Sequence, residues 1–201
     1  MNEIETTINE SLNQAFDTAK VFLEKTTQTF VLEAAELISQ TFQSGGKLLV
    51  CGNGGSLCDA MHIAEEFTGQ FRRYRKALPA IALSDPSHIT CVGNDMGFDA
   101  IFSRGIEALG RAGDCLIVLS TSGNSSNVVE AVKTAKSMDL KVISLLGKQG
   151  GKLKGLSDLE FIFEGFGFSD RIQEVHMTLM HIVIEACEKI LFENTLTQTC
   201  R

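Results

Sequence analysis

Short apolar runs alternate along this chain with segments that have helical periodicity, and this alternation limits the possible folds most. The apolar runs cover residues 47–51, 79–83, 114–119, 140–146 and 159–163, the last being the weakest. The helical patterns that separate and follow them cover residues 56–69, 87–109, 125–138 and 169–192. Strands that alternate with helices form a parallel sheet with helices on both faces. We therefore predict an α/β fold, a doubly wound five-stranded sheet of flavodoxin-like order 2-1-3-4-5.

Two further helical stretches precede the first run and form an N-terminal extension. They cover residues 3–25 and 28–44, and Gly45-Gly46 ends the second as a left-handed cap would.

The chain shows no linker, repeat or low-complexity segment, so residues 1–201 are expected to form one domain. Residues 1–45 would supply helices for oligomer packing, and residues 46–193 would form the α/β core. The last helical segment is apolar nearly all round at residues 182–184, which also favours burial against partner helices.

Charge and hydropathy exclude several classes of function. A net charge of −7 argues against a nucleic-acid surface, which needs clustered cations. The N-terminus lacks the pattern of a secretion signal, and no apolar stretch approaches the ~18 residues of a membrane span. We expect a cytoplasmic protein that binds neither nucleic acid nor membrane. The one basic cluster, residues 72–76, is either a solvated loop or a cationic lip that attracts an anionic substrate.

The six cysteines have no CxxC pair and no metal-finger spacing. Cys51 and Cys115 lie in apolar runs, which favours buried, reduced thiols that act as small hydrophobic residues. A catalytic thiol is the less favoured alternative.

Two loops with the composition of anion-binding sites follow the first and third runs. The first loop is Gly52-Asn53-Gly54-Gly55-Ser56, and the second covers residues 120–125 with four hydroxyl side chains. Glycines allow close approach of the backbone, and hydroxyls beside a helix N-terminus suit a phosphate dianion without a lysine. Each loop alone is equally well a tight connection or a helix cap. Together, at neighbouring strand ends, they favour phosphate binding; the fingerprints of nucleotide-binding loops are absent.

Candidate catalytic groups follow these loops on two helices. His62 and Glu66 are four residues apart and share one helix face, which suits a metal site, a base beside a proton donor, or a surface ion pair. Gln173 and His181 lie ~12 Å apart along the last helix, so a ligand between them or a neighbouring subunit is needed to unite them. That helix carries Asp170, Gln173, His176 and His181 among apolar residues.

Six motifs in order resemble the sugar isomerase (SIS) domain family, and within it the phosphoheptose isomerases, over nearly the whole chain. They are CGNGGS, CDAMHIAEE, LPAIALSD, CVGNDMGF, STSGNSSNV and DRIQEVH. The resemblance implies an aldose-ketose isomerase that interconverts sedoheptulose 7-phosphate and D-glycero-D-manno-heptose 7-phosphate through an enediol. It also implies the first step of ADP-heptose biosynthesis for the lipopolysaccharide core, a homotetramer with interface active sites, and one zinc ion per subunit.

The resemblance also assigns roles to residues. Glu66 matches the catalytic base and His181 the catalytic acid, and both also match substrate or zinc positions. The phosphate-binding positions are Ser56, Ser120, Thr121, Ser122 and Ser125. The sugar-contacting positions are Asn53, Gly54, Gly55, Glu66, Asn94, Asp95 and Gln173. The zinc positions are His62, Glu66, Gln173 and His181. A carboxylate base suits a proton on carbon, and an imidazole of near-neutral pKa suits protons on oxygen.

Two alternatives stay open. One is a non-catalytic SIS-domain protein of the replication-initiator-associating type. Proteins of that type lack residues equivalent to His62 and Glu66. The other is an isomerase of another sugar phosphate, because sequence does not measure pocket length. The zinc is either catalytic or structural, since glutamine is an unusual zinc ligand and a zinc-bound carboxylate is a poorer base.

Overall fold

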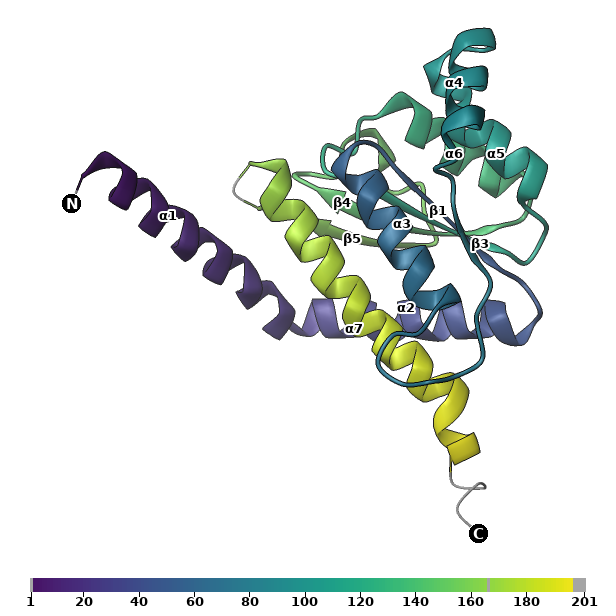
Figure 1. Ribbon diagram of the computed structural model, residues 1–201, viewed down its shortest axis with the longest axis horizontal. Coiled ribbons are helices and arrows are strands. Elements are labelled where there is room, and N and C mark those ends of the chain that lie inside the picture. The colour runs from purple at the N-terminus through teal and green to yellow at the C-terminus, as the bar shows by residue number, and fades with distance from the viewer. Residues whose placement is uncertain (1, 166, 197–201) are drawn as a thin grey trace.

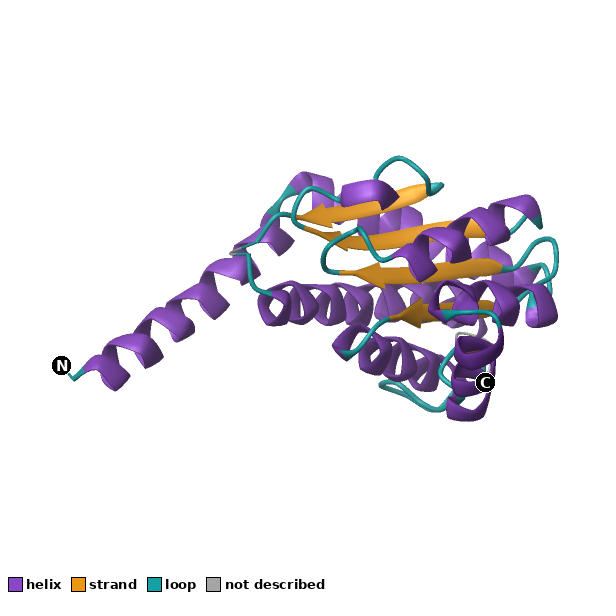
Figure 2. Ribbon diagram, turned by 90° about the horizontal axis from the view of Figure 1, so that it is seen from above, coloured by secondary structure: helices purple, strands orange, loops and turns teal. Residues whose placement is uncertain are grey.

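The described residues form a five-stranded parallel sheet, and its arrows all point the same way (Figure 2). The computed structural model describes residues 2–165 and 167–196, with the backbone alone for residues 193–196. The strand order β2-β1-β3-β4-β5 confirms the prediction. The strands are β1 (Leu48–Gly52), β2 (Ala80–Ala82), β3 (Cys115–Ser120), β4 (Lys141–Gly147) and β5 (Leu159–Phe163).

Helices pack on both faces of the sheet, as predicted (Figure 1). The helices of one face are α2 (Lys25–Gln43), α3 (Gly55–Thr68) and α7 (Ser169–Leu196). The helices of the other face are α4 (Pro86–Asp95), α5 (Ile101–Leu109) and α6 (Ser126–Ser137). The remaining helical elements are α1 (Glu3–Thr18), η1 (Ala19–Leu23), η2 (Phe98–Ala100) and η3 (Gly151–Leu153).

Alternate residues of the central strands enter two separate cores. In β1, Leu48 and Val50 join the core under α2, α3 and α7, whereas Leu49 and Cys51 join the other. Because helices cover both faces of the sheet, the central strands appear in the sequence as continuous apolar runs. Cys51 and Cys115 are buried free thiols, as predicted. Burial raises the pKa of both, so neither is a reactive thiolate.

The predicted helix over residues 87–109 is wrong in one respect, because the chain breaks it into α4 and α5. Gly97 has φ +94°, a value that a right-handed helix does not admit. The turn η2 then reorients the chain before α5 begins. The start of α4 is fixed by Asp85, whose side chain accepts a hydrogen bond from the backbone N–H of His88.

The helix α1 extends away from the sheet as an arm (Figures 1 and 2). Four of its apolar side chains recur every fourth residue and are exposed by half or more: Ile4, Ile8, Leu12 and Phe16. A stripe of this spacing covers one side of a helix. Among the described residues, no helix combines the length and hydropathy that a membrane crossing needs.

The strand order brings the two predicted anion-binding loops together. β1 and β3 are neighbours, and Gly52 at the end of β1 is in register with Leu119 near the end of β3. Both strands therefore release their loops at the same edge of the sheet, where ligands of doubly wound folds bind.

Candidate active site

A pair of asparagine side chains joins the two loops. The Nδ2 of Asn53 donates to Oδ1 of Asn127 at 2.8 Å, and the Nδ2 of Asn127 donates back at 2.9 Å. Asn127 is buried at the start of α6. The amide of Asn53, predicted to contact the sugar, thus also holds the first loop beside the second.

The second loop uses its hydroxyl groups partly on its own backbone. Ser120 Oγ accepts from the N–H of Gly123 at 3.1 Å, and Ser122 Oγ accepts from the N–H of Asn124 at 3.2 Å. Ser125 is the N-cap residue of α6, yet its side chain makes no capping hydrogen bond. The first N–H groups of α6 therefore have no side-chain cap, which favours an anion at that position.

One glycine in each loop packs closely against another segment of the chain. A Cβ on Gly123, which has φ +64°, would lie 1.9 Å from the carbonyl oxygen of Gly150 after β4. A Cβ on Gly55 would lie 2.6 Å from Nε2 of Gln173 on α7. Only glycine fits at residue 123, where the obstacle is backbone, whereas at residue 55 the obstacle is the end of the Gln173 side chain. The second loop is thus wedged against the β4 loop, and the first against the start of α7.

The predicted base and acid meet between α3 and α7. Oε1 of Glu66 lies 3.2 Å from Nε2 of His62 and 4.0 Å from Nε2 of His181. The two imidazole rings meet edge to face, with centroids 5.0 Å apart. One ligand atom from each of the three residues lies within 4.8 Å of the others. The side chain of neighbouring Glu65 is 66% exposed.

The Nε2 of His181 is buried and makes no hydrogen bond within the described residues. Burial lowers the pKa of His181, the positive charges of His62 and Arg72 lower it further, and Glu66 opposes them. His181 therefore favours its neutral form, which carries one N–H donor and one lone pair. Such a ring can both give and accept a proton.

Gln173 lies apart from this group in the single chain. Its Nε2 donates to Ser56 Oγ at 3.4 Å, at the beginning of α3. His62 is six residues further along that helix, ~9 Å along its axis. The structure therefore brings together His62, Glu66 and His181, and it places Gln173 beside Ser56 at the start of α3. Its predicted roles in binding substrate and zinc stay predictions.

Two other predicted sugar contacts are exposed on α4. Nδ2 of Asn94 donates to Oδ1 of Asp95 at 2.7 Å, and Cys91 Sγ lies 3.7 Å from the other Asp95 oxygen. These contacts are local, so the roles of Asn94 and Asp95 also stay predictions.

Asp59 was missed from the sequence, although it shares a face of α3 with Ser56 and Glu66. Its Oδ2 is buried and unpaired within the described residues. Burial raises its pKa to about 6, although His62 opposes the shift. Its three-residue spacing from Ser56 and from His62 is the pattern that marks this shared face.

The basic cluster of residues 72–76 divides into buried and exposed members. The Arg75 side chain is only 5% exposed and pairs with Glu188 of α7 at 2.7 Å. Arg72 is 58% exposed and pairs with Glu185. Tyr74 is almost fully exposed. Neither interpretation from the sequence describes Arg75, which is part of the packing between α3 and α7.

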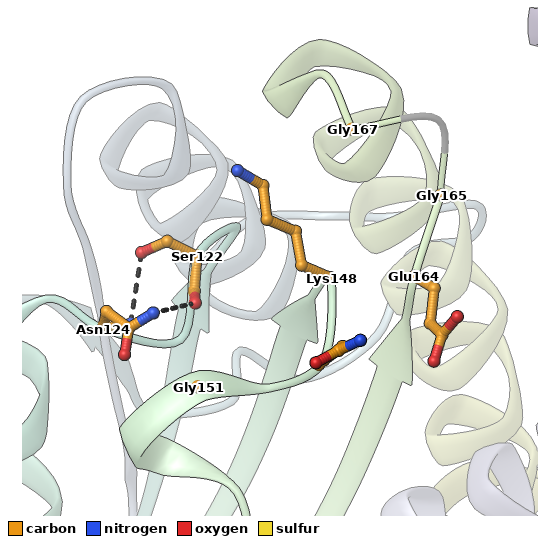
Figure 3. Close-up of a pocket in the computed structure, with 8 residues that line it drawn as sticks. Ser122, Asn124, Lys148, Gly151, Glu164, Gly165 and Gly167 are labelled. Atoms are coloured by element: carbon orange, nitrogen blue, oxygen red, sulfur yellow. Dashed lines mark hydrogen bonds between the residues drawn. The ribbon is translucent and has the colours of Figure 1, made fainter.

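A cavity of about 480 Å³ lies between the second loop and the segments that follow β4 and β5 (Figure 3). Ser122 and Asn124 line it together with Lys148 and Glu164. Lys148 has φ +55°, an uncommon value for a residue other than glycine and often associated with function. The sequence favoured an anion site without a lysine. Lys148 directly follows β4, the strand beside β3, and it was not among the residues predicted from the sequence.

Comparison with known proteins gives consistent matches. The family model of the SIS domain matches residues 10–147. A phosphoheptose isomerase from Fusobacterium nucleatum subsp. nucleatum is 54% identical over 183 residues, which cover 90% of this chain and 94% of that protein. A phosphoheptose isomerase from Escherichia fergusonii is 52% identical over 90% of this chain and 95% of its own.

Two solved structures extend this similarity to the fold. A phosphoheptose isomerase from Francisella tularensis matches with a TM-score of 0.88 and 33% identity, covering 94% of this chain and 100% of that chain. One from Neisseria gonorrhoeae matches with a TM-score of 0.77 and 40% identity, covering 92% and 97%.

Proposed function

The chain belongs to the SIS domain family, in which it is a phosphoheptose isomerase, and we propose that Glu66 and His181 carry the proton transfers of its reaction. The reaction interconverts the ketose sedoheptulose 7-phosphate and the aldose D-glycero-D-manno-heptose 7-phosphate. The observation that carries the proposal is the 4.0 Å approach of the Glu66 carboxylate to the His181 imidazole. A non-catalytic role is not favoured, because the pair His62 and Glu66 is present and assembled with His181.

Glu66 acts on carbon. Within the described residues its hydrogen bonding involves Oε1, which leaves Oε2 for the substrate. Oε2 removes a proton from C1 of the ketose to give the enediol and returns that proton to C2. The Glu66 side chain is 15% exposed, and a carboxylate with little water around it is a stronger base towards carbon than one in bulk solvent.

His181 acts on oxygen. As C1 loses its proton, the ring N–H of His181 gives a proton to O2, and the ring later accepts the proton of O1. The carbonyl thus moves from C2 to C1 with no net gain or loss of protons. The neutral ring has one N–H to donate and, after donation, a nitrogen that accepts the proton of O1.

The phosphate is bound at the opposite end of the substrate. We place it between the two loops, on the hydroxyl groups of residues 120–125, on Ser56 and on the first N–H groups of α6. Ser56 and Glu66 are ten residues apart on α3, ~15 Å along its axis. Because helical side chains tilt toward the N-terminus, the Glu66 carboxylate shortens this span. A long acyclic sugar phosphate fits between the two ends, and its phosphate supplies binding energy for orientation.

His62, Glu66 and His181 fit a zinc site. Two imidazoles and a carboxylate are usual zinc ligands, and three protein ligands with an open position are typical of catalytic zinc. The buried Nε2 of His181 without a partner is the observation that supports this assignment. Zinc at this position would supply Lewis-acid polarisation of the substrate oxygens. Gln173 becomes a ligand only if it turns from Ser56 or comes from another subunit.

The assembly and setting of the enzyme are also proposals. A homotetramer with interface active sites would bury the exposed stripe of α1 and would explain the distance of Gln173, Asn94 and Asp95 from Glu66. We place the enzyme in the cytoplasm, at the first step of ADP-heptose biosynthesis for the lipopolysaccharide core. Light scattering of the purified protein would measure the mass, and a monomer at micromolar concentration would contradict the tetramer.

Purified protein assayed against a panel of ketose phosphates, with and without a chelator, tests the substrate. Sedoheptulose 7-phosphate should have the highest kcat/KM. A clear preference for a pentose or hexose phosphate would assign another substrate. No turnover of any sugar, together with a stable protein partner, would favour a non-catalytic module.

A further inference from the structure

We propose that Arg75 is a positioning residue, which holds Glu66 and His181 at their working separation by clamping α3 to α7. This inference rests on the catalytic roles proposed above for these two residues. It concerns the loop of residues 69–76, which leaves the end of α3 and runs beside α7.

The Arg75 guanidinium first closes the end of α3. Its Nη2 donates to the carbonyl oxygen of Glu66 at 2.6 Å, and its Nη1 donates to those of Phe67 at 2.7 Å and Gly69 at 3.1 Å. The last carbonyl groups of a helix have no partner within the helix and carry its negative dipole end. A buried guanidinium satisfies both needs at the backbone of the catalytic base itself.

The same guanidinium then reaches α7. Its Nε donates to Oε1 of Glu188 at 2.7 Å, and the Glu188 side chain is 14% exposed. One planar, five-donor group therefore contacts both helices that carry the proposed catalytic pair. A lysine at this position lacks the donors to make these contacts together.

Two more contacts run along the same stripe of α7. Phe71 stacks on the ring of His181 at 5.7 Å between centroids, with an interplanar angle of 27°. Arg72 pairs with Glu185 and lies over the Phe71 ring at 5.3 Å. His181, Glu185 and Glu188 follow one another at spacings of four and three residues, so they share one helix face. The loop thus packs along this face and covers one side of the His181 ring.

These contacts have a specific consequence for catalysis. Substrate phosphate binds at the other end of α3, so loosening the clamp leaves ground-state binding unchanged. The separation of base and acid then varies, and small misplacements of catalytic groups reduce turnover strongly. A change confined to turnover distinguishes positioning from simple loss of stability.

The test compares Arg75→Gln with Lys47→Gln. Lys47 forms a comparably buried ion pair with Asp114, but at the amino end of β1, remote from the site. Both variants should lose thermal stability. With the same added zinc, Arg75→Gln should lower kcat ~10–100-fold with KM within ~2-fold of wild type, while Lys47→Gln should keep both.

Two further variants keep the proposal falsifiable if Arg75→Gln folds poorly. Arg75→Lys keeps the charge and should recover only part of kcat. Arg75→Ala should regain kcat when guanidinium is added at millimolar concentration, and added sodium chloride should have no such effect. Wild-type kcat in a folded Arg75→Gln protein, or equal losses of kcat in the Lys47 and Arg75 variants, would overturn the clamp. An active Glu66→Gln enzyme would instead overturn the proposed function.

Discussion

The carboxylate Oε1 of Glu66 on α3 lies 4.0 Å from Nε2 of His181 on α7, with no hydrogen bond between them. The gap is too long for a direct hydrogen bond, so both groups can still bind a third atom placed between them. His62 completes the arrangement at 3.2 Å from the same carboxylate oxygen. A buried imidazole nitrogen left without a partner beside a hydrogen-bonded histidine–carboxylate pair is typical of a site prepared for a ligand.

Zinc binding should depend on His62. The purified enzyme should hold about one zinc per chain, because two imidazoles and a carboxylate converge within 4.8 Å. His62→Ala should lose most of this zinc and the increase in melting temperature that zinc gives the wild type. Elemental analysis and thermal melts with and without chelator measure both effects. Full zinc content in His62→Ala would place the ion elsewhere.

Lys148 should strengthen phosphate binding. It lines the cavity shared with Ser122 and Asn124, and a cation there favours a dianion in a protein of net charge −7. Lys148→Ala should raise KM for sedoheptulose 7-phosphate several-fold, with kcat nearly unchanged and a weaker dependence of KM on salt. Lys152→Ala is the matched control, since Lys152 is exposed in the following turn and does not line the cavity. Equal KM values for the two variants would remove Lys148 from the site.

Gly123→Ala should destabilise the protein more than Gly113→Ala. Both glycines have positive φ, but a Cβ at residue 113 meets nothing within 4 Å, whereas one at residue 123 meets the Gly150 carbonyl at 1.9 Å. The free energies of unfolding of the two variants should therefore differ by about 1–3 kcal/mol. This difference measures the close packing of the second loop against the loop after β4. Denaturant titration measures it, and only Gly123→Ala should raise KM. Equal destabilisation would show that the β4 loop moves aside freely.

His176 should make the enzyme less stable in mild acid. It is buried, and burial lowers its pKa to about 4, against a weaker opposing effect from the backbone of Leu146. The unfolded chain takes up this proton near pH 6.5 and the folded chain only near pH 4, so stability is full above pH 6.5 and falls between these values. The loss reaches about 3 kcal/mol at pH 4. His176→Met, which does not titrate, should show a flatter pH dependence of the free energy of unfolding. Parallel curves for the two proteins would contradict this.

Much of the fold follows from local pattern. The order of apolar runs and helices predicts the sheet, and the loops after β1 and β3 meet because parallel strands share an edge. The four-residue spacing of His62 and Glu66 predicts that they share a helix face, and their 3.2 Å contact confirms it. These features depend on period and chain order, which sequence contains directly.

Other features depend on packing between distant segments, which one sequence does not display. The break at Gly97 needs a positive φ that glycine permits but does not require. The burial of Arg75 depends on Glu188, far along the chain. Lys148 lines the cavity beside the second loop only because β4 lies beside β3. In each case the residue type is visible and its partner is not.

Exchange of the C1 proton of sedoheptulose 7-phosphate with deuterated water reports the step assigned to Glu66. Wild-type enzyme should incorporate deuterium as it isomerises the sugar, because Glu66 holds the proton between its removal and return. Glu66→Gln should lose both exchange and turnover by a factor of ~100–10,000, with an unchanged fold by circular dichroism. Exchange and turnover at the wild-type rate in a folded Glu66→Gln enzyme would contradict the account.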